Sequence, residues 1–227
     1  MKTLAIETTA PVGSLAFFND GQVLRHWTLP EDRRSAATLA AELQRALQAI
    51  GWRPNDVELV AVSLGPGSFT GVRIGLVTAK VFAYATGAQL IGVDSLDAVA
   101  ENIPGTYSPL VVLADAQRGE ITAKLYVWEP TAGWLITKQS GLVTPQDWLP
   151  HLALEHQFWL AGPGLYRFKE SIGDQYRMVP EAFWSPTAVG VGKLAWKRFL
   201  AGQTDDIWTL APIYYRASYA EEKRAPR

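Results

Sequence analysis

A run of glycines is the first feature of this chain with a chemical meaning. Residues 63–75 read Ser-Leu-Gly-Pro-Gly-Ser-Phe-Thr-Gly-Val-Arg-Ile-Gly, between an apolar strand candidate and a long apolar helix candidate. Glycines at such a turn permit positive φ angles and close backbone approach. The free N–H groups at a helix start also favour an anion. The segment therefore predicts either the tight start of a closely packed helix or an anion-binding loop made of Gly65, Gly67, Ser68, Gly71 and Arg73.

Two common phosphate-binding motifs do not match this segment. A Walker A loop ends in Gly-Lys followed by Ser or Thr, whereas Gly71 is followed by Val72 and Arg73. A Rossmann fingerprint has its third glycine where this chain has Thr70. The anion-binding interpretation therefore depends on the glycines and the helix start.

Two carboxylates end apolar strand candidates at equivalent points of the chain. Glu7 follows Leu-Ala-Ile, and Asp115 follows Leu-Val-Val-Leu-Ala. In folds made of two lobes that begin with the same strand–loop–strand unit, such carboxylates can face a nucleotide and a metal between the lobes. The alternative is a solvated or helix-capping carboxylate at a strand end. The sequence leaves both interpretations open.

The histidines and cysteines argue against catalysis by this chain alone. The sequence has three histidines (His26, His151 and His156) and no cysteine. His151 and His156 are five residues apart, which does not align them on one helix face as a spacing of four does. Ser68 has no evident histidine partner and is not in a Gly-x-Ser-x-Gly elbow. We therefore expect no metal site and no catalytic residue.

Composition indicates a globular protein whose surface as a whole is not basic enough to attract nucleic acid. The 227 residues are 48% apolar, and the formal net charge is −1. Such a chain is long enough for one large domain or two lobes. Without a basic balance, any contact with nucleic acid must be local or made by a partner. The absence of a signal-peptide pattern and of a membrane-spanning run leads us to expect a soluble, cytoplasmic protein.

The elements that must hold these residues form two similar series. A strand, a hairpin at Asp20-Gly21, a helix at 35–50 with Ser35 as N-cap, a strand at 59–64 and a helix at about 70–86 come first. Residues 104–109 break the periodicity, and the strand–loop–strand beginning then recurs from residue 110. Helices alternating with strands predict an α/β fold, and the recurrence suggests duplication. We therefore expect lobes at 1–104 and 105–227.

The two helices of the first lobe predict an interface with another protein. The helix at about 70–86 is apolar nearly all round, and such a helix must be covered on every side. The helix at 35–50 carries a heptad-like seam of apolar residues next to small alanines. The interface residues predicted on the two helices are Ala36, Ala40, Leu43, Leu47, Val72, Arg73, Leu76 and Lys80.

The glycine segment at 63–75 resembles the signature of the TsaB (YeaZ) family, the dimerisation subunits of the bacterial complex that makes threonylcarbamoyladenosine in tRNA. Further segments resemble the family in the same order: Leu-Ala-Ile-Glu-Thr-Thr at 4–9, Gly-Val-Asp-Ser-Leu-Asp-Ala-Val-Ala at 92–100, Asp-Ala-Gln-Arg-Gly-Glu at 115–120, Pro-Ile-Tyr-Tyr-Arg at 212–216 and Ala-Glu-Glu-Lys at 220–223. This chain departs from the pattern at Glu7, where many members have Asp.

The resemblance implies an actin/Hsp70-like (ASKHA) duplicated fold, with two lobes of mixed sheet covered by helices. It also implies a non-catalytic subunit that binds and activates the catalytic paralogue TsaD through the two helices of the first lobe. The ATPase TsaE would be a further partner, the chain alone could form a homodimer, and tRNA would be reached indirectly. No cofactor is expected for the chain itself; a nucleotide at the subunit interface stays open.

Two other functions are compatible with the sequence. The first alternative is an ATP-dependent, sugar-kinase-like enzyme of the same fold that uses Glu7 and Asp115 around magnesium. The second is a peptidase, which the missing metal ligands disfavour.

Overall fold

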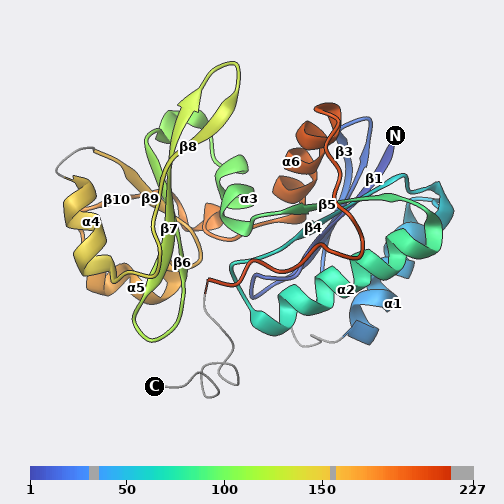
Figure 1. Ribbon diagram of the computed structural model, residues 1–227, viewed down its shortest axis with the longest axis horizontal. Helices are drawn as coiled ribbons and strands as arrows, with labels where there is room; N and C mark the ends of the chain where they lie inside the picture. Colours follow the sequence, from blue (N-terminus) through green and yellow to red (C-terminus); the bar gives the residue numbers. More distant parts are fainter. Residues whose placement is uncertain (31–35, 154–156, 216–227) are drawn as a thin grey trace.

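The computed structural model describes residues 1–30, 36–153 and 157–215, and it has two lobes that are each built on a five-stranded sheet (Figure 1). The first sheet has the order β3-β2-β1-β4-β5. β1 pairs antiparallel with β2 and parallel with β4, and β4 pairs parallel with β5. Its strands are β1 (Lys2–Glu7), β2 (Ser14–Asn19), β3 (Gln22–Thr28), β4 (Leu59–Ser63) and β5 (Gln89–Val93).

The second sheet repeats this arrangement. Its order, β8-β7-β6-β9-β10, corresponds strand by strand to that of the first sheet. β6 pairs antiparallel with β7 and parallel with β9, as β1 does with β2 and β4. Its strands are β6 (Leu110–Asp115), β7 (Ile121–Glu129), β8 (Gly133–Gln139), β9 (Trp159–Ala161) and β10 (Arg177–Met178). The predicted α/β architecture and its internal duplication are confirmed.

The helices also correspond between the two repeats. The pairs are α1 (Ala36–Ala49) with α4 (Pro145–Ala153), α2 (Phe69–Thr86) with α5 (Leu165–Ile172), and α3 (Ser95–Glu101) with α6 (Ala188–Leu200). Short 3-10 turns cover Pro54–Asp56, Gly105–Tyr107 and Glu181–Phe183. The sequence Gly-Pro-Gly leads from β4 toward α2 at residues 65–67, and from β9 into α5 at residues 162–164. The repeat therefore extends to the loop that contains the glycines.

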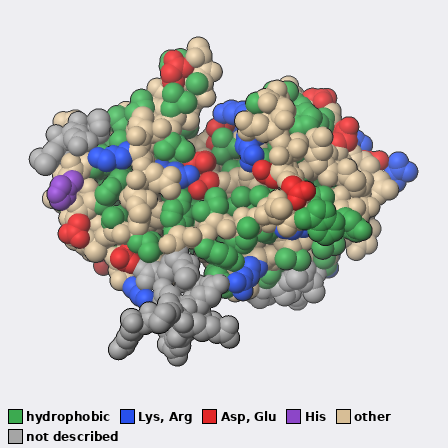
Figure 2. Space-filling model, viewed as in Figure 1, with side chains coloured by type: hydrophobic (Ala, Val, Ile, Leu, Met, Phe, Trp, Pro, Cys, Tyr) green, Lys and Arg blue, Asp and Glu red, His purple; other side chains and the backbone are tan. Residues whose placement is uncertain are grey.

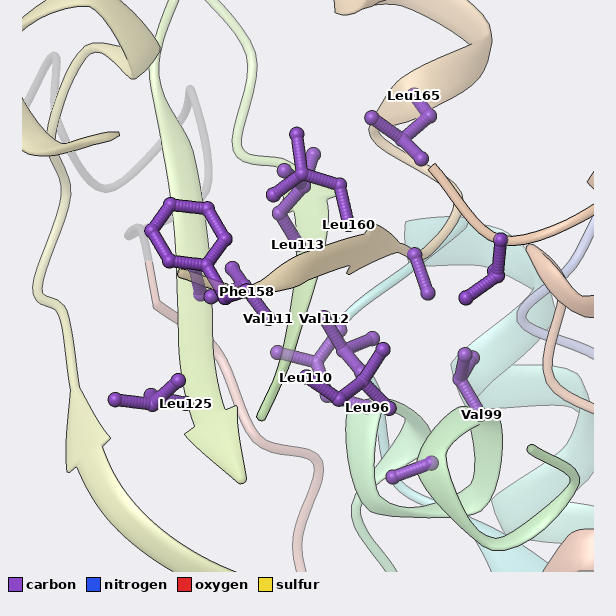
Figure 3. Close-up of a cluster of buried hydrophobic side chains, with 14 of the residues drawn as sticks. Leu96, Val99, Leu110, Val111, Val112, Leu113, Leu125, Phe158, Leu160 and Leu165 are labelled. Atoms are coloured by element: carbon purple, nitrogen blue, oxygen red, sulfur yellow. The ribbon is translucent and has the colours of Figure 1, made fainter. Parts of the chain in front are cut away.

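The last helix of each repeat covers the sheet of the other repeat. Leu96 and Val99 of α3 pack in the core of the second lobe beside Leu110 of β6 (Figure 3). Val191 and Ala195 of α6 pack in the core on one side of the first sheet. α3 and α6 also contact each other. This exchange of helices joins the two lobes through buried apolar surface.

The C-terminal segment, residues 205–215, returns to the first lobe. Asp205 forms a bridge with Leu90 of β5, and the N–H of Ile213 donates to the carbonyl oxygen of Leu64 at 2.8 Å. The predicted division at residues 104 and 105 falls between α3 and β6. Residues on both sides of that division thus pack on the first sheet.

The predicted helices are confirmed to within two residues at each end that the structure describes. α1 and α2 correspond to the predictions at 35–50 and about 70–86. The predicted N-cap, Ser35, lies outside the described residues. The hairpin at Asp20-Gly21 is also confirmed, with φ angles of 48° and 76° that suit its two-residue turn. No helix within the described ranges is long and apolar enough to cross a bilayer.

Candidate functional site

The glycine segment connects β4 to α2 and forms the first turns of that helix. Ser68 caps α2, because its Oγ accepts a hydrogen bond from the Gly71 N–H at 3.2 Å. Its carbonyl oxygen accepts from the Val72 N–H at 2.8 Å, and its own N–H donates to the carbonyl oxygen of Thr9 at 2.9 Å. Three N–H groups of this helix start are therefore bonded within the protein.

The glycines allow α2 to lie directly against the loop that follows β1. A Cβ on Gly71 would lie 1.9 Å from the carbonyl oxygen of Thr8, and a Cβ on Gly75 would lie 2.2 Å from Thr8 Oγ1. A Cβ on Gly67, whose φ is 157°, would lie 2.6 Å from Thr9 Cβ. Thr8 Oγ1 also donates to the carbonyl oxygen of Gly71 at 2.7 Å. Close packing thus explains the glycine spacing, whereas anion binding at this loop stays a prediction.

Glu7 lies beneath the same loop and is completely buried. Its Oε1 accepts hydrogen bonds from the Thr9 N–H at 2.7 Å, from the Thr9 hydroxyl and from the Ser63 hydroxyl at 3.2 Å. Its Oε2 accepts from the Ala10 N–H at 3.3 Å. Burial raises the pKa of the Glu7 carboxyl above its usual value, and these hydrogen bonds oppose the shift. Burial contradicts the interpretation of Glu7 as a solvated carboxylate, whereas a role toward a nucleotide and a metal stays a prediction.

Asp115 ends β6, the strand that corresponds to β1, and it is partly exposed. Its Oδ1 accepts a hydrogen bond from the Gln117 N–H at 2.7 Å. Its Oδ2 forms an ion pair with Arg167 of α5 at 2.9 Å. Asp115 therefore ties the loop after β6 to α5, which suits the interpretation as a structural carboxylate at a strand end.

One side of α2 is apolar and exposed to solvent, and we call it the outer face of α2. It consists of Phe69, Val77, Val81 and Tyr84, which are 39, 59, 62 and 68% exposed. Their spacing of eight, four and three residues places them on one side of a helix. In Figure 2, hydrophobic side chains gather over the part of the first lobe where α2 lies. A contiguous exposed apolar face of this kind is typical of a protein–protein interface.

The C-terminal segment adds two aromatic rings along the outer face of α2. Trp208, which is 74% exposed, packs edge-on against Tyr84 with a centroid distance of 5.6 Å. The ring of Tyr214 lies 5.0 Å from that of Phe69. The guanidinium of Arg73 lies 3.8 Å from the centre of the Phe69 ring, and its Nε donates to the Tyr214 hydroxyl at 2.9 Å. The face therefore also presents one oriented positive charge.

A buried charged cluster joins the two repeats. Nζ of Lys124 on β7 lies 2.8 Å from Oδ2 of Asp94 and 2.8 Å from Oδ1 of Asp97, at the start of α3. The Tyr126 hydroxyl donates to Asp97 Oδ1 at 2.7 Å, and the Tyr215 hydroxyl donates to Asp94 Oδ2 at 3.5 Å. The Lys124 side chain is 5% exposed. We call these five residues the Lys124 cluster; acidic and basic side chains meet between the lobes in Figure 2.

The residues of the Lys124 cluster shift one another's pKa values. Burial and the neighbouring Asp97 carboxylate raise the pKa of Asp94, against the opposing effect of Lys124. Burial lowers the pKa of Lys124, but the carboxylates of Asp94 and Asp97 outweigh it, so the pKa is raised. Burial and Asp97 raise the pKa of Tyr126 well above its usual value. Lys124 therefore stays charged beside the two carboxylates, of which Asp94 is 10% and Asp97 30% exposed.

A pocket of about 290 Å³ opens beside the glycine segment. It is lined by Thr8, Ala10, Pro11, Gly13, Leu29, Pro30, Thr38, Leu39, Ser68, Thr70, Gly71 and Ile74. These residues provide hydroxyl groups and apolar walls but no charged side chain. Within the described residues, no group of three or more His, Asp or Glu side chains is placed to hold a metal ion.

Known proteins match the chain along nearly its whole length. The TsaB protein of Escherichia coli (strain K12), described as a tRNA threonylcarbamoyladenosine biosynthesis protein, is 27% identical over 227 residues, which cover 98% of each chain. The chain is therefore similar to a TsaB protein over almost its whole length. The TsaB protein of Bacillus subtilis (strain 168) is 29% identical over 132 residues, 57% of this chain and 56% of that relative.

A solved structure also shares the fold described above. The solved structure of YeaZ from Pseudomonas aeruginosa superimposes with a TM-score of 0.77 at 22% identity, over 94% of this chain and 99% of that one. Residues 28–132 match the model of a related family, "TsaD: tRNA N6-adenosine threonylcarbamoyltransferase". The glycine segment of this chain, which holds α2 against the loop after β1, lies within those residues.

The prediction is wrong for four of the interface residues, because their side chains are buried. Leu43, Leu47, Val72 and Leu76 are 2 to 5% exposed and lie on the core side of α1 and α2. The prediction failed because a helix apolar on all sides does not reveal which side the sheet covers. The seam chosen on α1 follows the side that packs inward.

The remaining predicted interface residues stay predictions. Ala40 and Arg73 are exposed, and Lys80 is partly buried. The side chain of Ala36 lies outside the described residues. Of the predicted anion-binding residues, Gly65 is buried, and the other four, Gly67, Ser68, Gly71 and Arg73, are partly or fully exposed.

The sequence analysis missed the Lys124 cluster. Asp94 and Asp97 stand in the segment 92–100, which was singled out only as a family motif. Lys124 stands in an alternating strand whose residues 121–126 are all buried. A lysine inside such a buried run needs carboxylate partners, and this signal could have been used.

Proposed function

We propose that this chain is a non-catalytic subunit in the synthesis of threonylcarbamoyladenosine in tRNA, and that it binds and activates the catalytic threonylcarbamoyltransferase TsaD. The observation that carries the proposal is the outer face of α2, whose four apolar side chains are 39 to 68% exposed. The names of the E. coli and B. subtilis relatives supply the pathway. The match of residues 28–132 to the TsaD model supports a paralogous partner of related fold.

The space between the lobes supports a binding role over a kinase-like one. A nucleotide and magnesium between the lobes would need accessible carboxylates. Glu7 is buried under its loop, and Asp94 and Asp97 hold the ammonium of Lys124. Asp94 and Asp97 are thus already paired with a cation of the chain itself.

Further partners follow from the same proposal. The ATPase TsaE would bind the assembled pair, and the outer face of α2 would pair with itself in a homodimer when TsaD is absent. No cofactor is proposed for the chain itself, and a nucleotide at the boundary between the subunits stays open. Because the chain has a formal net charge of −1, tRNA would be held chiefly by the partner.

The proposal is tested by reconstitution of threonylcarbamoyl transfer to tRNA. TsaD, TsaE, ATP and a source of threonylcarbamoyl-adenylate are mixed with and without this chain. Transfer that requires the chain, and that survives Asp115→Asn, supports a non-catalytic subunit. Equal transfer without the chain would refute it. Tight binding of ATP and magnesium by the isolated chain, lost in Asp115→Asn, would favour the kinase-like alternative.

A further inference from the structure

Two adjacent tyrosines connect the outer face of α2 with the Lys124 cluster. The Tyr214 hydroxyl accepts a hydrogen bond from Arg73 Nε at 2.9 Å. The next side chain, Tyr215, donates to Asp94 Oδ2 at 3.5 Å and accepts from Gln139 Nε2 at 3.2 Å. Asp94 belongs to the first repeat, whereas Gln139 ends β8 of the second repeat. Two consecutive residues therefore make the two kinds of contact: Tyr214 contacts the outer face of α2, and Tyr215 connects the two repeats.

The segment that carries these tyrosines is anchored before it reaches them. Asp205 accepts hydrogen bonds from Arg198 at 3.1 Å and from the Gly92 N–H at 2.8 Å. The Ile213 N–H donates to the carbonyl oxygen of Leu64 at 2.8 Å. Beyond Ile213, the described chain is held by the contacts of Tyr214 and Tyr215. Loss of the Tyr215 contacts should therefore free Tyr214 as well.

Arg73 is placed to bind a negatively charged group of a partner. Its Nε is used by Tyr214, and its guanidinium stacks on Phe69. Its two terminal nitrogens form no hydrogen bond or ion pair with the residues that the structure describes. A guanidinium held in this way offers a fork that matches a carboxylate.

We propose that Tyr215 is a positioning residue: by bonding to both repeats it fixes Tyr214, and Tyr214 orients Arg73 toward a carboxylate of the partner chain. The proposal rests on the proposed function, because the partner is the subunit that covers the outer face of α2. It goes beyond that function because it makes the orientation of the Arg73 guanidinium depend on the bonds of Tyr215 to the two repeats. Tyr215 itself would not contact the partner.

The first test measures binding to purified TsaD by titration calorimetry. Tyr215→Phe keeps the ring and removes both hydrogen bonds, and it should weaken binding by about 3- to 10-fold, the range of one net hydrogen bond such as that between Arg73 and Tyr214. In an Arg73→Ala background the same substitution should cause no further loss. Gln139→Ala, which removes the contact to the second repeat alone, should cause a smaller loss. Tyr176→Phe, on the far side of the second lobe, is the matched control and should leave the affinity unchanged.

Unaltered affinity of Tyr215→Phe would overturn the proposal. Equal weakening in the wild-type and Arg73→Ala backgrounds would overturn it too, because Tyr215 would then act by another route. Thermal unfolding of each variant shows whether a loss of affinity reflects a loss of folded protein.

The second test uses the isolated chain and does not depend on a partner. The NMR signal of Arg73 Nε–H reports its hydrogen bond to Tyr214. Tyr215→Phe and Tyr214→Phe should both shift this signal and speed its exchange with water. If the signal responds but wild-type chain does not bind TsaD, the positioning role stands and the proposed function fails. If Tyr215→Phe leaves the Arg73 Nε–H signal unchanged, the positioning role is refuted whether or not the chain binds TsaD.

Discussion

Replacing Lys124 by methionine should strongly destabilise the fold, because it leaves the nearly buried Asp94 beside the partly exposed Asp97 without their shared cation. Lys124 is 5% exposed and lies 2.8 Å from both Asp94 and Asp97. Removing one partner of a buried ion pair costs about 3–5 kcal/mol. For a domain of this size, that loss lowers the melting temperature by roughly 6–20 °C. Differential scanning calorimetry at pH 7 measures it directly.

Lys197 provides a matched control for this prediction. Its Nζ also lies 2.8 Å from a carboxylate oxygen, that of Glu101, and it links α6 to α3, whereas Lys124 links β7 to α3. Its side chain is 51% exposed, so Lys197→Met should cost about 1 kcal/mol or less. The reasoning from burial is refuted if the two variants lose similar stability, or if Lys124→Met loses less than about 1 kcal/mol.

The same variant should respond to pH in a defined direction. Without Lys124, the pKa of Asp94, already raised by burial and by Asp97, rises further. The folded variant then binds a proton that the unfolded chain binds only at lower pH. Its stability relative to wild type should therefore increase as the pH falls from neutral, and adding Asp94→Asn should recover much of the loss at pH 7.

Three further predictions concern the first lobe. Gly71→Ala should cost roughly 3 kcal/mol, because the new Cβ would meet the Thr8 carbonyl oxygen, whereas Gly141→Ala, with open space, should be nearly neutral in urea unfolding. Leu76→Ala should destabilise the chain by about 2–5 kcal/mol, as expected for a core residue, and a neutral result would return Leu76 to the interface. Burial raises the pKa of Glu7, so the stability that Glu7 contributes should fall as the pH rises through its pKa in the folded state. Glu7→Gln should flatten this pH dependence of the free energy of unfolding. An unchanged pH profile in Glu7→Gln would contradict the raised pKa.

Much of the fold could be predicted from local patterns. The glycines and proline before α2, the Asp20-Gly21 turn and the recurrence of an apolar strand ending in a carboxylate are all short-range signals. They gave the main helices of the first lobe, the hairpin and the duplication correctly. The exchange of α3 and α6 between the sheets was not predictable in this way, because it depends on contacts far apart in the chain.

The candidate site was predicted less well for two physical reasons. On α2, the inner residue Leu76 and the outer residue Val77 have the same chemistry, so hydropathy alone could not assign Leu76 to the core. At the end of β1, Glu7 is a charged residue type that is rarely buried, and the loop that satisfies it is formed partly by Ser63, far along the chain. Charged residues at strand ends were therefore interpreted as exposed.

The central claim is that the outer face of α2 binds the catalytic subunit. The most direct test is the affinity for TsaD of the double variant Val77→Asp/Val81→Asp, measured beside the control Val23→Asp on the edge strand β3. The two valines are 59 and 62% exposed, and Val23 is 45% exposed. Burying the valines should contribute about 2–4 kcal/mol, so the double variant should bind roughly 30- to 800-fold more weakly. The account predicts this loss with an unchanged melting temperature and with wild-type affinity for Val23→Asp. Wild-type affinity of the double variant would contradict it.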